Sequence, residues 1–430
     1  MRYLLKNLTI IHPEQKINEK NIDLLIVDGK IVELKKNIEI DDNSIRVIDL
    51  SDKIIAPGFI DMHVHLREPG REDEETIETG CRAAAAGGFT AVACMPNTEP
   101  TVDSEEIVEF IINKSKNFIV DVYPIAAATL GRKGEILSPM CELKESGAVA
   151  FSDDGVAIKT ASILRRVMDY SKMLNLPVIE HCEDESLSNG SMNEGLNSTL
   201  FGLAPLPSVS EDIIVMRDIL MAEYTGAHIH IAHISSGNAV KLVREAKSKN
   251  IRVTAEVTPH HFTLTDDLLK SYDTNLKMNP PLRTQKDIEE ISLALKDGTI
   301  DCIASDHAPH SLEEKELEFD YAPNGIVGLE TSVGLSLSEL YHKKILTLDD
   351  LIMKYSINPR KILNLKVPLF KVDTEAEFTI LDLNEVWTVD KDKFFSKSKN
   401  TPFDKRLLTG RAIGIFNKGK LFLNGEIIKN

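Results

Sequence analysis

The sequence predicts an α/β fold, a (β/α)8 barrel of the TIM type with a small β-sandwich domain formed by both chain ends. Two observations support this prediction. Between about residue 54 and residue 310, short runs rich in β-branched residues alternate eight times with polar turns and helical stretches. The two ends of the chain instead hold short β-rich runs with no helical pattern between them. Eight successive strand-helix units are typical of a closed parallel barrel.

Helical patterns fall between the predicted barrel strands. The first of them, residues 72–88, has acids in its first turn and glycines at its end, which are start and stop signals of a helix. The predicted strands span residues 54–65, 89–97, 120–129, 147–155, 176–184, 228–236, 251–261 and 301–310.

The two chain ends carry the turn signals of β-hairpins. Asp-Gly follows an apolar run at residues 28–29, and Asn-Gly occurs at residues 424–425. Neither end is long enough to build a good sandwich alone. We therefore expect residues 1–54 and 370–430 to pair as one composite β domain, and residues 55–369 to form the barrel.

Composition and charge exclude several classes of function. A net charge of −17 argues against binding to a phosphate backbone, so nucleic acid is not an expected partner. The start of the chain lacks the pattern of a signal peptide and no run reaches membrane-spanning length, so we expect a cytoplasmic protein without a membrane partner. The five cysteines are scattered without CxxC spacing, which fits reduced thiols.

Polar side chains close the predicted barrel strands. Because the active site of a parallel barrel lies at the carboxyl ends of its strands, these side chains should converge. His63 and His65, two residues apart, lie on the same side of the first strand. The other strand-end residues are Asn97, Asp153 with Asp154, His181, His233, His260 with His261, and Asp306.

Imidazole and carboxylate groups that converge from separate strands predict a metal centre. Nitrogen and oxygen ligands without nearby thiolates suit Zn²⁺, with Mn²⁺ or Co²⁺ as substitutes. A divalent metal lowers the pKa of a bound water, and two metals can also polarise a carbonyl, so hydrolysis is the natural reaction. Asp306 is placed to take the proton from that water and to deliver it to the leaving nitrogen.

Longer motifs narrow the prediction to one family. The segments "DMHVHLREPG", "MPNTEP", "SDDG", "HCED", "AHIS", "MNPPLR" and "SDHAPH" together resemble the dihydroorotase family of the amidohydrolase superfamily, in its long type I form. The resemblance runs from about residue 50 to residue 335, and the flanking β segments fit the extra β domain of that form.

The resemblance implies a ligand set for two Zn²⁺ ions per subunit. The matching positions are His63 and His65 for the first metal, His181 and His233 for the second, and Asp306 as the metal-bound catalytic base. Asp154 looks like the bridging carboxylate that takes the place of the carboxylated lysine found in many relatives, including hydantoinases. Asp153 is its rival for that position.

The resemblance also implies a set of substrate contacts. The matching residues are His65, Arg67, Asn97, Asn279, His310, Asn324 and Gly325. Arg67 and Asn97 would hold the substrate's carboxylate, because an anion in a site rich in acids needs a guanidinium with its planar fork. Asn279 and the backbone at residues 324–325 would meet the amide groups of the ring. The alternative is a surface salt bridge for Arg67 and a turn residue for Asn97.

Four further histidines and one loop are not assigned as metal ligands. We expect core packing or hydrogen bonds to the ligands from His260 and His261, and structural roles for His228 and His230. Residues 310–325 form a long acidic stretch after Asp306, which either closes over the site as a lid or stays a solvated loop.

The predicted reaction is the reversible, zinc-dependent interconversion of L-dihydroorotate and N-carbamoyl-L-aspartate in pyrimidine biosynthesis, as the resemblance implies. One alternative is an allantoinase or hydantoinase type of cyclic amidase. The other is a catalytically silent subunit that supports aspartate carbamoyltransferase. A homodimer and a complex with that transcarbamoylase are both compatible with the family.

Overall fold

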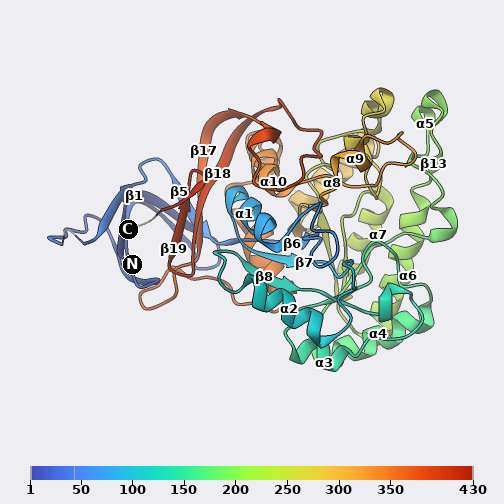
Figure 1. Ribbon diagram of the computed structural model, residues 1–430, viewed down its shortest axis with the longest axis horizontal. Coiled ribbons are helices and arrows are strands. Elements are labelled where there is room, and N and C mark those ends of the chain that lie inside the picture. Colours follow the sequence, from blue (N-terminus) through green and yellow to red (C-terminus); the bar gives the residue numbers. More distant parts are fainter. Residues whose placement is uncertain (1, 43, 429–430) are drawn as a thin grey trace.

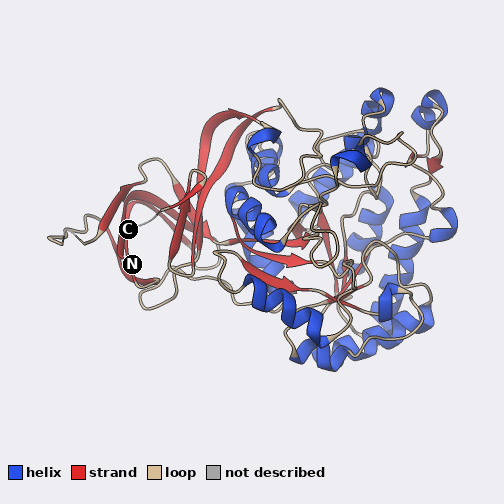
Figure 2. Cartoon of the chain, in the orientation of Figure 1, coloured by secondary structure: helices blue, strands red, loops and turns tan. Residues whose placement is uncertain are grey.

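The computed structural model describes residues 2–42 and 44–428 of the chain. Figure 1 shows a β-rich part beside a larger part in which helices surround central strands. Figure 2 shows the same division by element type, with long strands on one side and most helices on the other. The first and last strands of the chain both belong to the β-rich part.

Each predicted barrel range contains a strand, and these strands pair in parallel. They are β6 (Phe59–Val64), β7 (Phe89–Cys94), β8 (Asp121–Pro124) continued by β9 (Ala126–Ala127), β10 (Phe151–Ser152), β11 (Val178–Glu180), β14 (Ile229–Ile231), β15 (Val253–Val257) and β16 (Cys302–Ile303). A parallel bridge between Val64 and His307 joins the first strand to the chain after the last, which closes the ring. The barrel prediction is confirmed.

Helix α1 (Ile77–Gly87) shows how the local sequence sets the ends of a covering helix. The hydroxyl of Thr76 accepts a hydrogen bond from the backbone N–H of Thr79, and the Thr79 side chain accepts one from the backbone of Thr76. Gly88 ends the helix with a φ of 93°, a left-handed conformation that favours glycine. The helix thus occupies the second half of the predicted stretch.

The other helices cover the barrel or its loops. The longer ones are α2 (Glu105–Ser115), α4 (Ala161–Leu174), α6 (Val209–Thr225), α7 (Gly237–Ser248), α8 (Gln285–Asp297) and α10 (Leu329–Ser336). The shorter ones are α3 (Met140–Glu145), α5 (Leu196–Phe201), α9 (Leu312–Lys315), α11 (Leu348–Ile352) and α12 (Asn358–Ile362). Across residues 2–42 and 44–428, no helix has both the length and the apolar character needed to cross a membrane.

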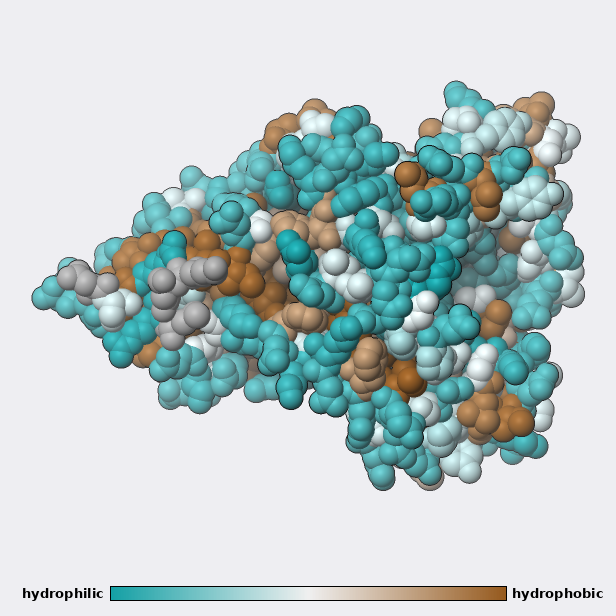
Figure 3. Space-filling model, viewed as in Figure 1, coloured by the Kyte–Doolittle hydropathy of each residue, from teal (hydrophilic) through white to brown (hydrophobic). Residues whose placement is uncertain are grey.

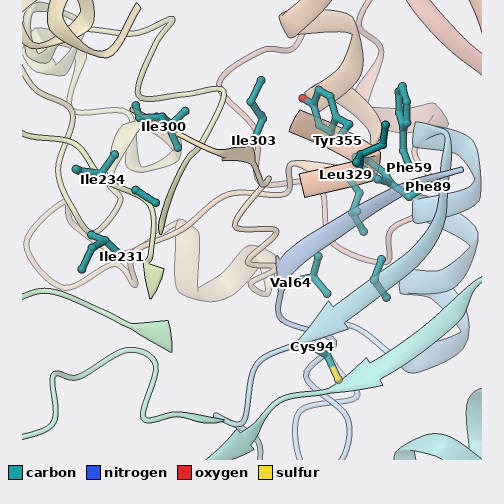
Figure 4. Packing of buried hydrophobic residues seen from close by; sticks show 14 of the residues in the cluster. Phe59, Val64, Phe89, Cys94, Ile231, Ile234, Ile300, Ile303, Leu329 and Tyr355 are labelled. Atoms are coloured by element: carbon teal, nitrogen blue, oxygen red, sulfur yellow. The ribbon is translucent and has the colours of Figure 1, made fainter. Parts of the chain in front are cut away.

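Aromatic side chains join the first two barrel strands to the helices outside them (Figure 4). The ring of Phe59 on β6 stacks on Tyr355 with centroids 5.3 Å apart, and Phe89 on β7 lies 5.9 Å from the same ring. The buried Tyr355 hydroxyl is satisfied by the hydroxyls of Ser332 and Ser336. This packing fixes β6, the strand that holds His63 and ends directly before His65.

Strands from both ends of the chain form one nine-stranded sheet in the order β20-β19-β18-β17-β5-β1-β2-β3, with β4 paired to β1. Their bounds are β1 (Arg2–His12), β2 (Ile17–Val27), β3 (Lys30–Lys35), β4 (Arg46–Asp49), β5 (Ile54–Pro57), β17 (Phe378–Thr388), β18 (Leu407–Asn417), β19 (Lys420–Leu423) and β20 (Glu426–Ile427). The antiparallel pairing of β5 with β17 joins the two ends. The range 54–65 therefore holds two strands, one in this sheet and one in the barrel.

The nine-stranded sheet is strongly curled around a core of its own. Tyr3 on β1 and Phe416 on β18 lie three strands apart in the sheet, which would separate them by about 14 Å if it were flat. Their ring centroids are only 5.8 Å apart, and Phe416 also stacks on Phe378. The two layers of the predicted sandwich are thus parts of one continuous sheet, while the domain boundaries at residues 54 and 370 stay a prediction.

Candidate metal centre and substrate pocket

The predicted metal ligands lie at or directly after the ends of five barrel strands, and all are buried. They are His63 on β6, His65 after β6, Asp154 after β10, His181 after β11, His233 after β14 and Asp306 after β16. Because the carboxyl ends of parallel strands meet at one face of a barrel, these side chains come together in a single cluster.

Asp154 lies between two groups of histidines. One of its carboxylate oxygens is 3.3 Å from Nε2 of His63, and the other is 3.7 Å from Nε2 of His65. The possible ligand atoms of these three residues lie within 4.8 Å of one another, and so do those of Asp154, His181 and His233. A carboxylate shared by two ligand groups has the geometry of a bridge between two metal ions.

The ring of His63 fits a metal ligand. Its Nδ1 is hydrogen-bonded to Oε1 of Glu256 at 2.7 Å, whereas its Nε2 has no hydrogen-bond partner among the described residues. A carboxylate on one ring nitrogen fixes the tautomer that offers the other nitrogen to a metal. Burial raises the pKa of Glu256, but the charge of His63 and hydrogen bonds from His230 and His63 lower it to about 2. The buried carboxylate therefore stays ionised.

The second pair of histidines is oriented in a similar way. Nδ1 of His181 and Nε2 of His233 lie 2.9 Å apart, and Nε2 of His181 lies 3.0 Å from a carboxylate oxygen of Glu183. Burial, together with the charges of His181 and His63, lowers the pKa of His233 to about 3. Imidazole nitrogens that face one point suit a common metal ion.

Asp306 approaches the first histidine pair from the eighth strand. Its Oδ1 lies 3.0 Å from Nε2 of His65 and 3.5 Å from Nε2 of His63. Burial raises the pKa of Asp306, but the hydrogen bond to His65 and the charge of His63 hold it far below its usual range. The side chain is an ionised carboxylate at the cluster, as a proton acceptor must be.

Three of these residues have an uncommon backbone conformation. The φ angles of His233, Asp306 and Arg67 are 30°, 48° and 59°, in the left-handed region that side chains with a Cβ rarely adopt. Each such residue costs on the order of 1 kcal/mol or more. Strain of this kind gathers at functional sites, where it aims side chains that a relaxed backbone would not.

Asp153 has a different partner from Asp154. Its two oxygens accept hydrogen bonds from the backbone N–H and the hydroxyl of Thr129, at 2.9 and 2.5 Å. Among the described residues, Asp153 belongs to neither of the two histidine groups. The structure therefore brings Asp154, and not its neighbour, to the cluster.

A cavity of about 210 Å³ opens in front of the cluster. It is lined by His65, Arg67, Asn97, Asp154, Gly155, His181, His233, Asn279, Asp306, Ala308, His310, Asn324 and Gly325. Pockets for drug-sized ligands start at about 300 Å³, so this one suits a smaller molecule. All the predicted substrate contacts thus meet in one pocket, with His63 behind its wall.

One buried carboxylate, Glu74, orients two of the predicted substrate contacts. Its Oε2 lies 3.1 Å from Nε of Arg67, and its Oε1 lies 3.1 Å from Nδ1 of His310. The same Nε donates a hydrogen bond to the carbonyl of Pro309, and Nη2 of Arg67 lies 3.3 Å from Nε2 of His310. Arg67 is therefore held inside the pocket wall and not in a surface salt bridge.

The two asparagines of the pocket are bonded to the cluster. Oδ1 of Asn97 lies 2.8 Å from Nδ1 of His65, and its Nδ2 donates to Asp154. Nδ2 of Asn279 donates to Glu183 at 2.5 Å and lies 3.3 Å from Nε2 of His181. Both amides thus fix ligand side chains while they line the pocket.

The backbone of Gly325 is used within the protein. Its N–H donates to the carbonyl of Lys277, and its carbonyl accepts from the side chains of Lys315 and Asn400. Its φ is 120°, and an added Cβ would come within 2.6 Å of the Ala308 Cβ. Gly325 is therefore packed too closely against Ala308 to carry a side chain, and its backbone hydrogen bonds are directed within the protein.

His261 and His230 have protein partners, whereas Nε2 of His260 is buried without a hydrogen-bond partner among the described residues. Nδ1 and Nε2 of His261 are bonded to Thr258 and to the carbonyl of Pro280. Nε2 of His230 lies 3.3 Å from the second oxygen of Glu256, so this histidine extends the chain of contacts behind His63. Neither belongs to a histidine-carboxylate group that could hold a metal, among the residues described here.

Three glutamates of the site were not predicted from the sequence. Glu256 supports His63, Glu183 supports His181, and Glu74 supports Arg67 and His310. Glu256 leaves a signal, since it is a charged residue inside an otherwise apolar strand run. Glu74 and Glu183 stand in acidic stretches, where solvent-exposed glutamates look the same.

Comparison with known proteins shows which family has sequences similar to this chain. The family described as "Dihydro-orotase-like" matches residues 52–239. A protein named Dihydroorotase from Pelotomaculum thermopropionicum is 48% identical over 431 residues, covering 100% of each chain. Another from Syntrophus aciditrophicus is 45% identical and covers 98% of this chain and 99% of its own.

Solved structures share the fold along the whole chain. An L-hydantoinase (dihydropyrimidinase) from Arthrobacter aurescens superposes with a TM-score of 0.88 at 23% identity, covering 100% of this chain and 97% of its own. A D-hydantoinase (dihydropyrimidinase) from Thermus sp. has a TM-score of 0.81, also at 23% identity and the same coverage. At such identities the likeness concerns the architecture, a barrel with an added β sheet.

Proposed function

The chain belongs to the dihydroorotase family, and from this premise we propose that it catalyses the reversible hydrolysis of L-dihydroorotate to N-carbamoyl-L-aspartate in pyrimidine biosynthesis. It is a metal-dependent cyclic amide hydrolase. The observation that carries the proposal is the position of Asp154, which contributes to two histidine groups at the floor of a pocket that also holds a buried arginine.

We assign the metal as Zn²⁺, two ions per subunit, because the ligand atoms are imidazole nitrogens and carboxylate oxygens. The ligands would be His63, His65, Asp154, His181, His233 and Asp306. When bound, the metal supplies a water of lowered pKa and polarises the carbonyl under attack. The orphaned Nε2 of His63 and the facing nitrogens of the second pair support this set.

Asp306 acts as the proton carrier in this proposal. In the hydrolytic direction its carboxylate takes the proton of the attacking water and delivers it to the ring nitrogen as the amide bond breaks. In the biosynthetic direction it takes the proton from the carbamoyl nitrogen and returns it to the departing water. Its place 3.0 Å from Nε2 of His65 supports a position next to the reacting atoms.

Arg67, Asn97 and His310 bind the carboxylate of the substrate. Dihydroorotate is an anion, and Arg67 lines the pocket beside the acids of the cluster. Its Nε is engaged by Glu74 and Pro309, which leaves the outer guanidinium nitrogens for a carboxylate. Asn279 and Asn324, which both line the pocket, would face the ring amides, next to Gly325.

The test is the rate of L-dihydroorotate ring opening by the purified, zinc-supplied protein, followed by ultraviolet absorbance. Hydantoin and allantoin serve as competing substrates, and Asp306→Asn as the control. We expect turnover of dihydroorotate that the substitution abolishes. Turnover of hydantoin or allantoin alone would move the protein to a neighbouring cyclic amidase. Silence on all three substrates would favour the non-catalytic partner of aspartate carbamoyltransferase.

We further propose a homodimer formed through helix α6. Five apolar side chains on its outer face, Val209, Ile213, Met216, Leu220 and Tyr224, are each 42–69% exposed. The outer face of a surface helix is normally polar, so this stripe needs a partner. A two-fold axis would pack the same stripe against itself.

The size of the stripe supports this assembly. It extends over about 22 Å of helix, and exposed Tyr170 and Met173 of α4 lie on the neighbouring helix. Figure 3 shows apolar surface on the face near α4. A standard interface buries about 800 Å² per partner, which such a two-helix surface can supply. Sedimentation should show a dimer that Leu220→Glu converts to a monomer; a monomeric parent protein would contradict the proposal.

We also propose a cytoplasmic location and an association with aspartate carbamoyltransferase. The five cysteines are free in the structure, as in a reducing compartment. The association would hand carbamoyl-aspartate directly to the pocket, and co-sedimentation of the two purified proteins tests it. Independent sedimentation at micromolar concentrations would contradict it.

A further inference from the structure

The wall of the pocket opposite the metal ligands is held by a residue from outside the barrel. The connection between β17 and β18 leaves the nine-stranded sheet and brings Asn400, only 6% exposed, to this wall. Its Nδ2 donates to the carbonyls of Ala308 and Gly325 at 3.0 and 3.2 Å, and its Oδ1 accepts from the backbone N–H of His310 at 3.2 Å. Its own carbonyl accepts from Val327 at 2.9 Å.

These four bonds link two backbone segments that both line the pocket. The first segment carries Ala308 and His310, and the second carries Asn324 and Gly325. Nε2 of His310 lies 2.7 Å from the carbonyl of Asn324, so the spacing between the segments also sets this contact. The carbonyl of Pro309 holds Nε of Arg67, and a shift of the first segment would therefore move the arginine too.

We propose that Asn400 is a positioning residue for substrate binding, because it ties the backbone at Ala308–His310 to the backbone at Gly325 and so fixes the width of the pocket. The inference rests on the proposed function, since it assigns the substrate contacts to these two segments. The position of part of the substrate site would then depend on Asn400, which lies 90 residues after His310 in the sequence.

The segment that carries Asn400 is itself anchored to the barrel. The backbone N–H groups of Phe395 and Ser396 donate to the two oxygens of Glu330, and that of Lys397 donates to Glu75. The hydroxyl of Ser398 donates to the carbonyl of Glu74 at 2.7 Å, next to the carboxylate that orients Arg67. The backbone before Asn400 is thus held in place by hydrogen bonds, as a positioning role requires.

Two buried lysines also bond to the backbone of this wall. Nζ of Lys315 donates to the carbonyls of Pro323 and Gly325, and Nζ of Lys277 donates to the carbonyls of Asp320 and Ala322. The carbonyl of Gly325 therefore receives one donor from Lys315 and one from Asn400. Residues 310–325 are thus bonded to one another by Lys315 and to the rest of the chain by Lys277 and Asn400, which argues against their acting as a lid.

The chain offers a matched control in Asn417. It is also 6% exposed, and its Nδ2 donates to the carbonyls of Thr90 and Ile119 and to the side chain of Asp121. These bonds join the nine-stranded sheet to β7 and β8, away from the residues that line the pocket. Replacing either asparagine by alanine removes a buried amide with several hydrogen bonds, but only Asn400 is bonded to residues that line the pocket.

The experiment compares the zinc-loaded parent protein with Asn400→Ala and Asn417→Ala. For Asn400→Ala we expect KM for L-dihydroorotate to rise by about 10- to 100-fold with a smaller change in kcat, because displaced contacts weaken binding. Bound zinc should be unchanged, and hydrogen exchange should accelerate within residues 308–327. Asn417→Ala should lower the urea midpoint and leave KM and exchange at 308–327 as in the parent.

An unchanged KM and unchanged exchange at 308–327 in Asn400→Ala would overturn the inference, whatever its stability. If that variant does not fold, Asn400→Asp decides the question, since it keeps the shape and the acceptor for His310 but loses both donated bonds. Lack of dihydroorotate turnover by the parent protein would instead count against the proposed function, and the exchange measurement would still test the tie between the two segments.

Discussion

The two sides of the pocket are built in different ways. The metal side consists of residues at the ends of barrel strands, where strand geometry alone brings them together. The substrate side consists of loop residues whose side chains are held by Glu74 and whose backbone is held by Lys315 and Asn400, residues that lie far from one another in the sequence. On the metal side a side chain is itself the functional group, whereas on the substrate side many side chains act by holding backbone.

This difference predicts two kinds of mutational effect. Losing a ligand removes an interaction that the reaction cannot do without, so kcat should collapse. Losing a support of the substrate wall moves contacts by a fraction of an ångström, so KM should change first. The predictions below test this contrast, beginning with the largest expected effect.

The largest effect should come from Asp154→Asn. This change removes the charge of the carboxylate that contributes to both histidine groups. We expect kcat to fall by a factor of about 1,000 or more, with loss of bound zinc, because a bridging ligand serves both ions. Metal analysis and initial rates of dihydroorotate hydrolysis measure this.

Asp153→Asn is the matched control for that substitution. Its oxygens accept only from Thr129 among the hydrogen bonds of the described residues, so zinc content should stay unchanged while the urea midpoint falls. If Asp153→Asn loses the metal and Asp154→Asn keeps it, the assignment of the bridge is reversed.

The metal side was predictable because strand geometry is local and repetitive. The spacing of His63 and His65 puts them on one face, and a polar residue that closes an apolar run marks a strand end. Strand periodicity could not decide between Asp153 and Asp154, because both residues follow the end of β10. The choice depends on the turn after Ser152, where Thr129, two residues beyond the end of β9, donates two hydrogen bonds to Asp153.

The second prediction concerns the support behind a ligand. Glu256→Gln keeps the size of the side chain but removes the charge that holds Nδ1 of His63. We expect zinc affinity to fall by about 10- to 100-fold, as for other supports of metal-bound histidines. Competition with a chelator measures the affinity.

Glu211→Gln provides the comparison for Glu256→Gln. Glu211 is a buried carboxylate paired with Arg283 and not with a histidine. Its substitution should lower stability with little change in zinc affinity. Equal losses of zinc affinity in the two variants would show that general destabilisation, and not the contact with His63, is responsible.

The third prediction moves to the substrate side. In Arg67→Lys the point charge of lysine replaces a planar fork that contacts Glu74, Pro309 and His310 at once. We expect KM for dihydroorotate to rise by about 10- to 100-fold with zinc content unchanged. Arg71→Lys is the control, because Arg71 meets the outer side of Glu74 and is partly exposed. A comparable rise in KM for Arg71→Lys would mean that the charge near Glu74, and not the fork of Arg67, sets the affinity.

The substrate side was predictable only in part. Arg67, Asn97 and His310 lie in motifs whose resemblance to the family identified them, but their supports leave no local signal. Asn400 lies in a stretch that we expected to belong to the β domain, and its contacts with the barrel depend on where the chain between β17 and β18 runs. Hydrogen bonds to backbone carbonyls have no residue pattern, so sequence periodicity cannot find them.

The smallest effect should be a change in pH dependence at the anchor of the segment that carries Asn400. Burial raises the pKa of Glu330 to about 7, even though Phe395 and Ser396 donate to its oxygens. An unfolded glutamic acid has a pKa of about 4.3, so the folded protein binds this proton more tightly than the unfolded chain does. The contribution of Glu330 to stability is therefore complete below about pH 4 and is lost as the pH rises to about 7 and above.

Glu330→Gln removes this titration and keeps an amide of similar shape. Urea midpoints of the zinc-loaded parent and variant, measured from pH 5 to pH 8, should show the parent losing stability relative to the variant as the pH rises. Because the anchor lies behind the substrate wall and not at the metal ligands, zinc content should be equal in both proteins over this range. Parallel pH curves would mean that Glu330 keeps an ordinary pKa, and that its charged form is fully stabilised by the two backbone donors.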